Sequence, residues 1–177
     1  MQEEKTILEN KIFSGRILNL YDDEVLLENG RCAKREYVSH NGGVCVVALN
    51  QDNEVYFVRQ YRYPYKEFVI EIPAGKLEKG EIPEIAAKRE LEEEIGAKAK
   101  NFEEIGVFYP SPGYTNEKIY MYLAYNLEFT SQNLDDDEFL EVGKMKIDEF
   151  VRLIDKGEIT DGKTIAAVLK VYLRRKK

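Results

Sequence analysis

The first forty residues alternate apolar and polar side chains in short runs, a period of two that is typical of β-strands. The runs lie at residues 11–13, 16–21 and 24–27, and turn residues divide them at Ser14-Gly15, Asp22-Asp23 and Asn29-Gly30. We therefore expect three antiparallel strands in this region. A sheet this small is marginally stable alone, so it needs a partner surface.

Longer apolar runs follow between residues 44 and 72. Gly42-Gly43 opens a strand at residues 44–49, and a polar turn at 51–53 leads into a second strand at 55–60. We expect these two strands to form a strongly apolar hairpin. A further strand is expected at residues 68–72, where Pro73 ends it.

The next segment changes to a helical period. Pro83 suits a first helical turn, while Ala87, Leu91 and Ile95 recur every four residues and give the helix one apolar stripe. Gly96 directly follows the last of these and suits a helix end. The sequence therefore predicts a helix that begins near Pro83 and stops at Gly96.

The second half of the chain mixes both periods without regular alternation. Strands are expected at residues 99–109, 118–126 and 139–147, and helices at 148–156 and from 161 onward. Residues 109–115 are too rich in proline and glycine for anything but a loop. Because the helices do not alternate with the strands, the pattern favours an α+β fold over a doubly wound sheet.

Composition and charge restrict the function classes. The 177 residues suffice for one core, or a core with a small appendage, and 44% of them are apolar. A net charge of −7 argues against nucleic acid and against anionic membranes as partners. The first residues lack both a basic segment and an apolar segment of a signal peptide, and no apolar stretch approaches eighteen residues. We expect a cytoplasmic protein.

The candidate chemistry lies on the predicted helix. Glu90, Glu93 and Glu94 stand at i, i+3 and i+4, so their carboxylates project from one face and repel one another. Such a cluster suits a divalent cation, and oxygen ligands without a histidine or cysteine pair favour magnesium or manganese over zinc. The alternative is a solvated acidic face that Lys88 and Arg89 balance at i+4.

The surrounding residues resemble the complete Nudix box, G-x5-E-x7-R-E-U-x-E-E-x-G-U, where U is apolar. Its fixed positions fall on Gly75, Glu81, Arg89-Glu90-Leu91, Glu93-Glu94 and Gly96-Ala97. The resemblance implies an α/β/α sandwich around a mixed sheet over residues 41–177. It also implies that residues 1–40 form the small N-terminal antiparallel β-sheet of the ADP-ribose pyrophosphatase branch, where this sheet packs against a second subunit in a homodimer.

Three features outside the box resemble that branch. Pro112 stands 16 residues after Gly96, as does the proline that marks ADP-ribose hydrolases. Residues 58–62 resemble the strand that carries a substrate-binding arginine. Residues 136–142 resemble the acidic loop that carries the catalytic base. The three features occur in the expected order.

The resemblance assigns roles to the acidic residues. Glu90 and Glu94 would be the principal Mg²⁺ ligands, with Mn²⁺ as the alternative ion, and Glu93 and the backbone carbonyl of Ala74 would complete the set. Arg89 would orient the cluster. Glu138 is the expected catalytic base, because an acid that chelates metal is poorly placed to accept a proton from water. Two neighbouring acids, Glu141 and Asp136, stay open as alternatives.

For the substrate, Arg62 and then Arg59 are the candidates for gripping phosphate, since a guanidinium binds two phosphate oxygens at once. Glu71, Pro112 and Gly113 are the further candidates. An exposed strand arginine and an edge acid that faces water are the alternative interpretations of Arg62 and Glu71.

The expected reaction is Mg-dependent hydrolysis of ADP-ribose to AMP and ribose 5-phosphate. Hydrolysis of another nucleotide sugar or nucleoside diphosphate derivative is the alternative, because the box handles only the pyrophosphate that these compounds share. A hypothesis from another class is a non-catalytic ADP-ribose sensor.

Overall fold

The computed structural model describes residues 3–134 and 139–176. By its internal contacts the chain divides into two compact units. The first unit contains Met1–Gly42 and Tyr109–Lys118, and the second contains Gly43–Phe108 and Ile119–Lys177.

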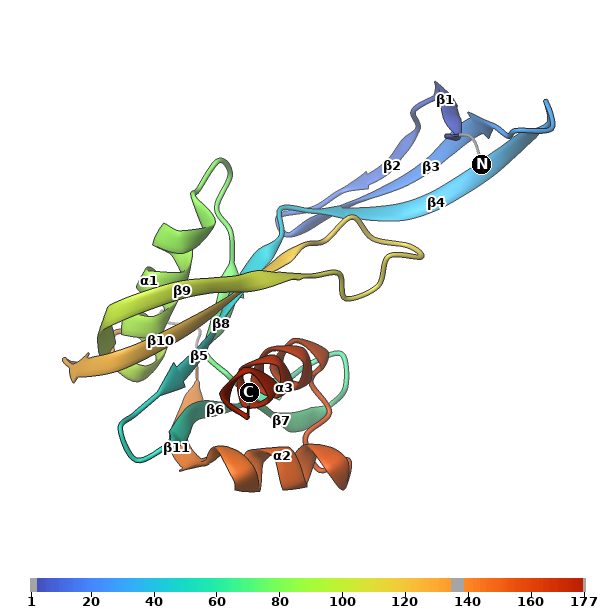
Figure 1. Cartoon of the computed structure of the whole chain (residues 1–177). Coiled ribbons are helices and arrows are strands. Elements are labelled where there is room, and N and C mark those ends of the chain that lie inside the picture. Colours follow the sequence, from blue (N-terminus) through green and yellow to red (C-terminus); the bar gives the residue numbers. More distant parts are fainter. Residues whose placement is uncertain (1–2, 135–138, 177) are drawn as a thin grey trace. The chain divides into compact units, whose positions relative to one another are not determined.

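The first unit is a four-stranded antiparallel sheet built around one long strand (Figure 1). Its strands are β1 (Lys5–Leu8), β2 (Lys11–Ser14), β3 (Leu18–Leu26) and β4 (Cys32–His40). Strand β3 pairs with β4 along its whole length, whereas β1 and β2 pair with different parts of β3. The alternating pattern correctly indicated antiparallel strands here.

The expected turn at Asp22-Asp23 is wrong, because β3 runs straight through these two residues and the described sheet has four strands rather than three. Asp23 is buried and accepts a hydrogen bond from the backbone N–H of Asn10 at 2.9 Å. A buried carboxylate that has a donor is tolerated inside a strand. Two adjacent aspartates therefore misled an interpretation based on turn propensity.

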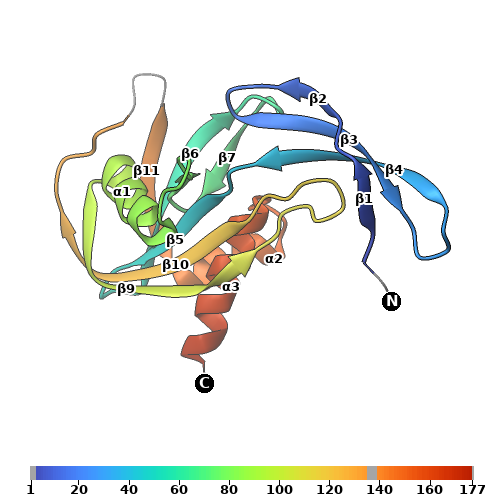
Figure 2. The ribbon, with the colours of Figure 1, turned by 90° about the horizontal axis from the view of Figure 1, so that it is seen from above.

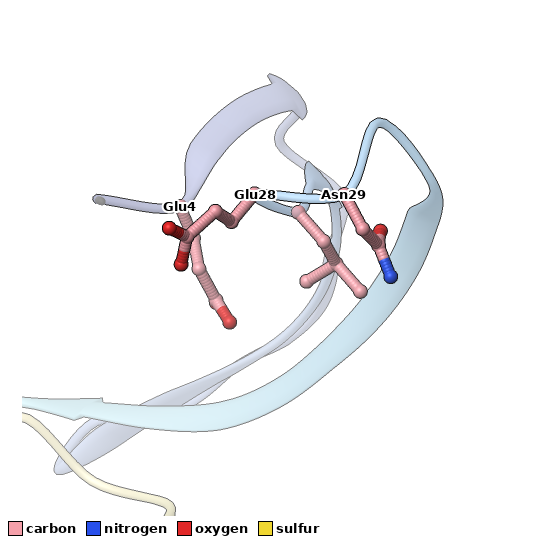
Figure 3. A pocket seen from close by; sticks show the side chains of 4 residues that line it. Glu4, Glu28 and Asn29 are labelled. Carbon is pink, nitrogen blue, oxygen red and sulfur yellow. The ribbon is translucent and has the colours of Figure 1, made fainter. Parts of the chain in front are cut away.

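The segment Tyr109–Lys118 is irregular, as its proline and glycine content predicted, and it is bound to β4. The N–H of Val38 donates to the carbonyl of Tyr114 at 2.8 Å, and the N–H of Asn116 donates to the carbonyl of Val38 at 3.2 Å. These bonds attach the loop with Pro112 and Gly113 to the first unit. Elsewhere in this unit, Glu4, Leu27, Glu28 and Asn29 line a shallow hollow (Figure 3).

The second unit contains a seven-stranded mixed sheet in which β5 and β10 are parallel and the other pairs are antiparallel. The strand order is β11-β6-β5-β10-β9, with β7 paired to β6 and β8 paired to β5. The strands are β5 (Gly43–Leu49), β6 (Glu54–Arg62), β7 (Glu67–Glu71), β8 (Ala74–Lys76), β9 (Ala97–Phe108), β10 (Ile119–Phe129) and β11 (Leu140–Lys146).

The sheet opens between β5 and β6. These strands pair at Leu49 and Val55, next to their connecting turn, and then take different partners. Strand β7 pairs with β6, β8 pairs with β5, and the chain passes from one to the other at Ile72 and Pro73. The predicted hairpin therefore exists only near its turn, and the short strand β8 was not predicted.

Helices cover both faces of this sheet (Figures 1 and 2). Helix α1 (Pro83–Ile95) packs on one face, where the core contains Val44, Val46, Ala87 and Leu91. Helices α2 (Ile147–Asp155) and α3 (Gly162–Arg175) pack on the other face, where the core contains Cys45, Val47, Phe150 and Val168. Alternate β5 side chains thus enter two different cores. The predicted α+β fold, an α/β/α sandwich around a mixed sheet with a small antiparallel sheet, is confirmed.

Local signals set the ends of α1 as expected. Pro83 stands at its first position, and Gly96 adopts a left-handed conformation with φ of 63° while its N–H caps the last turn. The predicted stripe of Ala87, Leu91 and Ile95 is buried. Among the described residues, no helix is both long and apolar enough to cross a membrane.

Candidate active site

The acidic face of α1 lies directly against β8. Oε2 of Glu94 accepts a hydrogen bond from the N–H of Ala74 at 2.9 Å. A Cβ atom at Gly75 would lie 1.9 Å from Cδ of Glu90, so only glycine lets the Glu90 carboxyl approach the strand this closely. Glu90 and Glu94 are 7% and 2% exposed. The alternative of a fully solvated acidic face is therefore wrong for these two residues.

Arg89 gathers three of the surrounding acids. Its guanidinium donates to Glu81 at 3.2 Å, and its Nη1 donates to both Glu90 and Glu93 at 2.8 Å. Burial alone would lower the pKa of Arg89, but the bonds to Glu81 and Glu93 and the charge of Glu90 raise this pKa above its ordinary value. The arrangement fits the predicted orienting role of Arg89, and Glu81 supports Arg89 from outside the acidic cluster.

The outer faces of α1 use other ion pairs. Lys88 contacts Glu84 rather than the expected Glu92, and Glu92 accepts from Lys98 at 2.9 Å. Both pairs are exposed, so each adds little to stability. Balancing charges on the helix surface are therefore separate from the acids that face β8.

The acids on this face suit a hard divalent cation that is shared with a substrate. In the described parts of the chain, no three His, Cys, Asp or Glu side chains are arranged as a complete metal cage. Magnesium does not require one, because it typically uses one or two carboxylates together with substrate phosphates and water. Glu90 and Glu94, packed against the Ala74-Gly75 strand, could provide such a partial oxygen set, and the Ala74 carbonyl stays a predicted further ligand.

The predicted substrate residue Arg62 belongs to a second charged group. Its Nε and Nη2 donate to the two carboxylate oxygens of Glu71 at 2.6 and 2.7 Å. Glu71 is 1% exposed and also binds Nζ of Lys163, which in turn donates to Asp161 at 3.0 Å. The interpretation of Glu71 as a water-facing edge acid is therefore wrong. Arg62 stays partly exposed and lies close enough to Glu94 for their charges to interact.

Arg59 is oriented differently from Arg62. Its guanidinium carbon lies 4.5 Å from the ring centre of Phe68, and its Nη1 lies 3.3 Å from the Glu141 carboxylate on the neighbouring strand β11. Arg59 and Glu141 are exposed, with 44% and 78% of their side chains accessible. A salt bridge of this kind is weak, so Arg59 stays available to a substrate anion.

The predicted base Glu138 and the alternative Asp136 lie outside the described residues. The chain before them is held at the end of α1, because the N–H of Asn133 donates to the carbonyl of Glu93 at 3.0 Å and Gln132 donates to the carbonyl of Glu94 at 2.6 Å. The described structure therefore brings Gln132 and Asn133 to the helix that carries the acids.

The predicted site residues fall in both units. Arg59, Arg62, Glu71, Ala74 and the α1 acids belong to the second unit, whereas Pro112 and Gly113 are exposed residues of the first unit. The hollow of the first unit does not suit a diphosphate, because Glu4 and Glu28 line it with negative charge.

Sequence reasoning missed Lys163, a member of the charged group, and its neighbour Thr164. Lys163 binds Glu71, and Oγ1 of Thr164 accepts the N–H of Ile72 at 3.0 Å in a buried position. Both contacts join residues 92 positions apart. The only local signal was Asp161, whose side chain accepts the N–H of Thr164 as a helix cap. A cap signal places the start of a helix but does not identify its neighbours.

Comparison with known proteins agrees with this geometry. The NUDIX domain profile matches residues 39–168. An ADP-ribose pyrophosphatase of Bacillus subtilis (strain 168) is 43% identical over 174 residues, which cover 97% of this chain and 94% of that protein. A methanol dehydrogenase activator of Bacillus methanolicus is 44% identical with the same coverage. A solved structure, an ADP compounds hydrolase, has a TM-score of 0.89 at 20% identity and covers 99% of this chain and 96% of that one.

The fold, the box and these matches define a Nudix hydrolase. The chain belongs to the Nudix family, and its resemblance to the ADP-ribose pyrophosphatase branch is confirmed by a relative of nearly equal length. Nudix hydrolases generally need divalent metal ions, which agrees with the oxygen-rich face of α1.

Proposed function

We propose that this protein hydrolyses the pyrophosphate bond of ADP-ribose and releases AMP and ribose 5-phosphate. The single observation that carries the proposal is the packing of Glu90 and Glu94 against the Ala74-Gly75 strand, three residues after Glu71, which binds Arg62. This arrangement offers oxygen ligands for a cation beside a guanidinium that can bind phosphate. The similarity to an ADP-ribose pyrophosphatase supports the choice of substrate.

The proposed ion is Mg²⁺, with Mn²⁺ as the alternative. Glu90, Glu94 and the Ala74 carbonyl would hold it, with Glu93 sharing a further ion. When bound, the ion neutralises charge on the diphosphate and polarises the attacking water. Arg89, which contacts Glu90 and Glu93, keeps those two carboxylates oriented.

The remaining steps are proposed for side chains of this chain. Arg62 binds a phosphate oxygen; because Nε and Nη2 serve Glu71, this contact uses Nη1. Arg59 is the second proposed phosphate contact, and Glu71, which is 1% exposed, serves the substrate by orienting Arg62. Pro112 and Gly113 belong to the first unit, and their substrate contacts stay predictions from the sequence. Glu138 accepts the proton from water, with Glu141 and Asp136 as alternatives.

The substrate assignment is tested by comparing kcat/KM for ADP-ribose with that for other nucleotide sugars in Mg²⁺. ADP-ribose should be the best substrate. A diphosphate hexose or a flavin dinucleotide with the higher value would retain the hydrolase but replace its substrate.

The catalytic role of the acidic face is tested with Glu93→Gln and Glu94→Gln. Glutamine at 94 still offers an oxygen to the Ala74 N–H, so the fold should persist while turnover falls by at least about a hundredfold. Glu92→Gln is the matched control, because Glu92 pairs with Lys98 on the outer face of the helix. If the wild type binds ADP-ribose in Mg²⁺ but does not hydrolyse it, the non-catalytic sensor would be favoured.

A second candidate is activation of a dehydrogenase, which the name of the Bacillus methanolicus relative suggests at 44% identity. Adding the wild type and Glu93→Gln to a purified methanol dehydrogenase separates the two functions. Activation by the wild type alone would make the effect a consequence of hydrolysis. Activation by both would assign it to binding instead.

We also propose that residues 1–40 mediate a homodimer and that residues 41–177 form the hydrolase domain. Strands β1 and β2 expose Ile7, Leu8, Ile12 and Phe13, each more than half accessible. Exposed apolar side chains gathered on a small sheet mark an interaction surface. Light scattering should give twice the mass of one chain, and Phe13→Asp should reduce it to a monomer. A monomeric wild type would remove the proposal of a homodimer.

The cytoplasmic location of the protein stays a prediction.

A further inference from the structure

The crossing between β7 and β8 is bound to two helices at once. On one side, Glu71 contacts Lys163 and the N–H of Ile72 donates to Thr164, both in the first turn of α3. On the other side, the N–H of Ala74 donates to Glu94 on α1. Four consecutive residues, Glu71 to Ala74, therefore connect the start of α3 to the acidic face of α1.

The charges at this crossing form a group of four. Arg62 and Lys163 are the two cations, and Glu71 and Asp161 are the two anions, so the group is neutral overall. Oε2 of Glu71 accepts from both Nη2 of Arg62 and Nζ of Lys163. Because Glu71 is 1% exposed and Lys163 only 13% exposed, water cannot readily replace either partner.

Sharing one carboxylate between two cations has a consequence for Arg62. With Lys163 present, Glu71 is neutralised from α3, and Arg62 keeps positive charge that a phosphate can use. Without Lys163, the group carries one net negative charge and Arg62 alone must compensate Glu71. An anionic diphosphate would then meet a less positive site and a guanidinium drawn toward the protein interior.

We infer that Lys163 is a positioning residue for substrate binding, which acts through Glu71 to keep Arg62 oriented and electrostatically available for the diphosphate. This inference rests on the proposed function, because it takes Arg62 as a phosphate contact. Lys163 itself touches no substrate in this role. The expected signature is a change in substrate affinity rather than in the chemical step.

The test compares Lys163→Met with Lys163→Arg in the full chain. Methionine removes the charge at similar length, whereas arginine restores a cation that can reach Glu71. We expect Lys163→Met to raise KM for ADP-ribose roughly tenfold, with kcat within about threefold of wild type, because lost uniform binding appears in KM. Lys163→Arg should recover most of the affinity. Lys170→Met, an exposed lysine on the same helix, should leave both constants unchanged.

A coupling measurement separates positioning from general structural support. If Lys163 acts through Glu71, then Lys163→Met should raise KM in the wild-type background and cause little further rise when it is added to Glu71→Gln. Effects that multiply in the double variant would show independent roles and overturn the inference. Glutamine also removes the buried charge, so the double variant carries no unpaired carboxylate at this position.

Equilibrium binding of ADP-ribose in EDTA gives a readout that does not depend on turnover. Weaker binding by Lys163→Met, restored in Lys163→Arg, would support the inference. The inference would be overturned if wild type and Lys163→Met bind ADP-ribose equally well. It would also be overturned if Lys163→Met lowers the melting temperature but leaves KM unchanged. Either outcome leaves the proposed function intact. A wild type that neither binds nor hydrolyses ADP-ribose would overturn the proposed function, and the positioning role with it.

Discussion

Gly75→Ala offers a sharp separation of activity from stability. A Cβ atom at this position would lie 1.9 Å from Cδ and 2.0 Å from Oε1 of Glu90, far inside contact distance. The obstacle is the end of a flexible side chain, so Glu90 can rotate away while the backbone keeps its place. The substitution should therefore displace one proposed metal ligand and disturb little else.

The expected magnitudes follow from those contacts. Displacing Glu90 breaks its bond to Arg89, which costs about 1–3 kcal/mol, whereas alanine in place of glycine recovers about 0.4–1 kcal/mol from the unfolded chain. The net loss of about 0–2.6 kcal/mol should lower the melting temperature by at most about 10 °C. Turnover should fall by about two to three orders of magnitude, as when one stabiliser of transition-state charge is removed.

The assay pairs AMP release from ADP-ribose with thermal denaturation, and Gly30→Ala is the control. Gly30 has φ of 77° and open space around it, so alanine there strains the backbone by about 1–2 kcal/mol without touching the site. The control should lose stability and keep its turnover. If Gly75→Ala keeps its turnover within threefold of wild type, then activity does not require the close packing of Glu90 on β8, and the reasoning is refuted.

Three further outcomes are expected. Thr164→Val should lower the free energy of unfolding by about 1–3 kcal/mol in urea titration, because the buried N–H of Ile72 loses its acceptor. The control Thr160→Val, at an exposed position, should change this free energy by less than about 0.5 kcal/mol. Equal effects of the two variants would contradict this prediction. Burial raises the pKa of Glu71, but Arg62 and Lys163 outweigh it and hold the pKa below its ordinary value. The wild type should therefore exceed Glu71→Gln in free energy of unfolding by a constant amount above about pH 4.3, the ordinary pKa of glutamate. This difference should shrink as the pH falls through the lower pKa of Glu71 in the folded protein. A difference that grows on acidification would contradict the prediction. Chelation by EDTA should abolish hydrolysis and Mg²⁺ should restore it, and hydrolysis that persists in EDTA would exclude the metal requirement.

The sequence was sufficient for the parts of the fold that local signals determine. Pro83 and Gly96 gave the ends of α1, because one fixes a first-turn conformation and the other accepts a left-handed one. The acidic face of that helix followed from spacing alone. Asp22-Asp23 was misread as a turn, because the hydrogen bond from Asn10 that accommodates Asp23 inside a strand cannot be seen in the local pattern.

The charged group around Glu71 could not have been predicted by the same reasoning. Arg62 and Glu71 lie on neighbouring strands, and their pairing depends on the register of β6 and β7. Lys163 contacts Glu71 from a helix that lies 92 residues later in the chain. Contacts across such separations depend on tertiary packing, which residue spacing does not encode.

The most direct measurement is the identification of products after the purified protein is incubated with ADP-ribose and Mg²⁺, with phosphorus NMR and chromatography as the readouts. Cleavage between the two phosphates predicts AMP and ribose 5-phosphate in equal amounts, with both formed at least about a hundredfold more slowly by the Glu94→Gln variant. Products from a different bond, such as ADP with free ribose, or unchanged ADP-ribose with the wild type, would contradict the account.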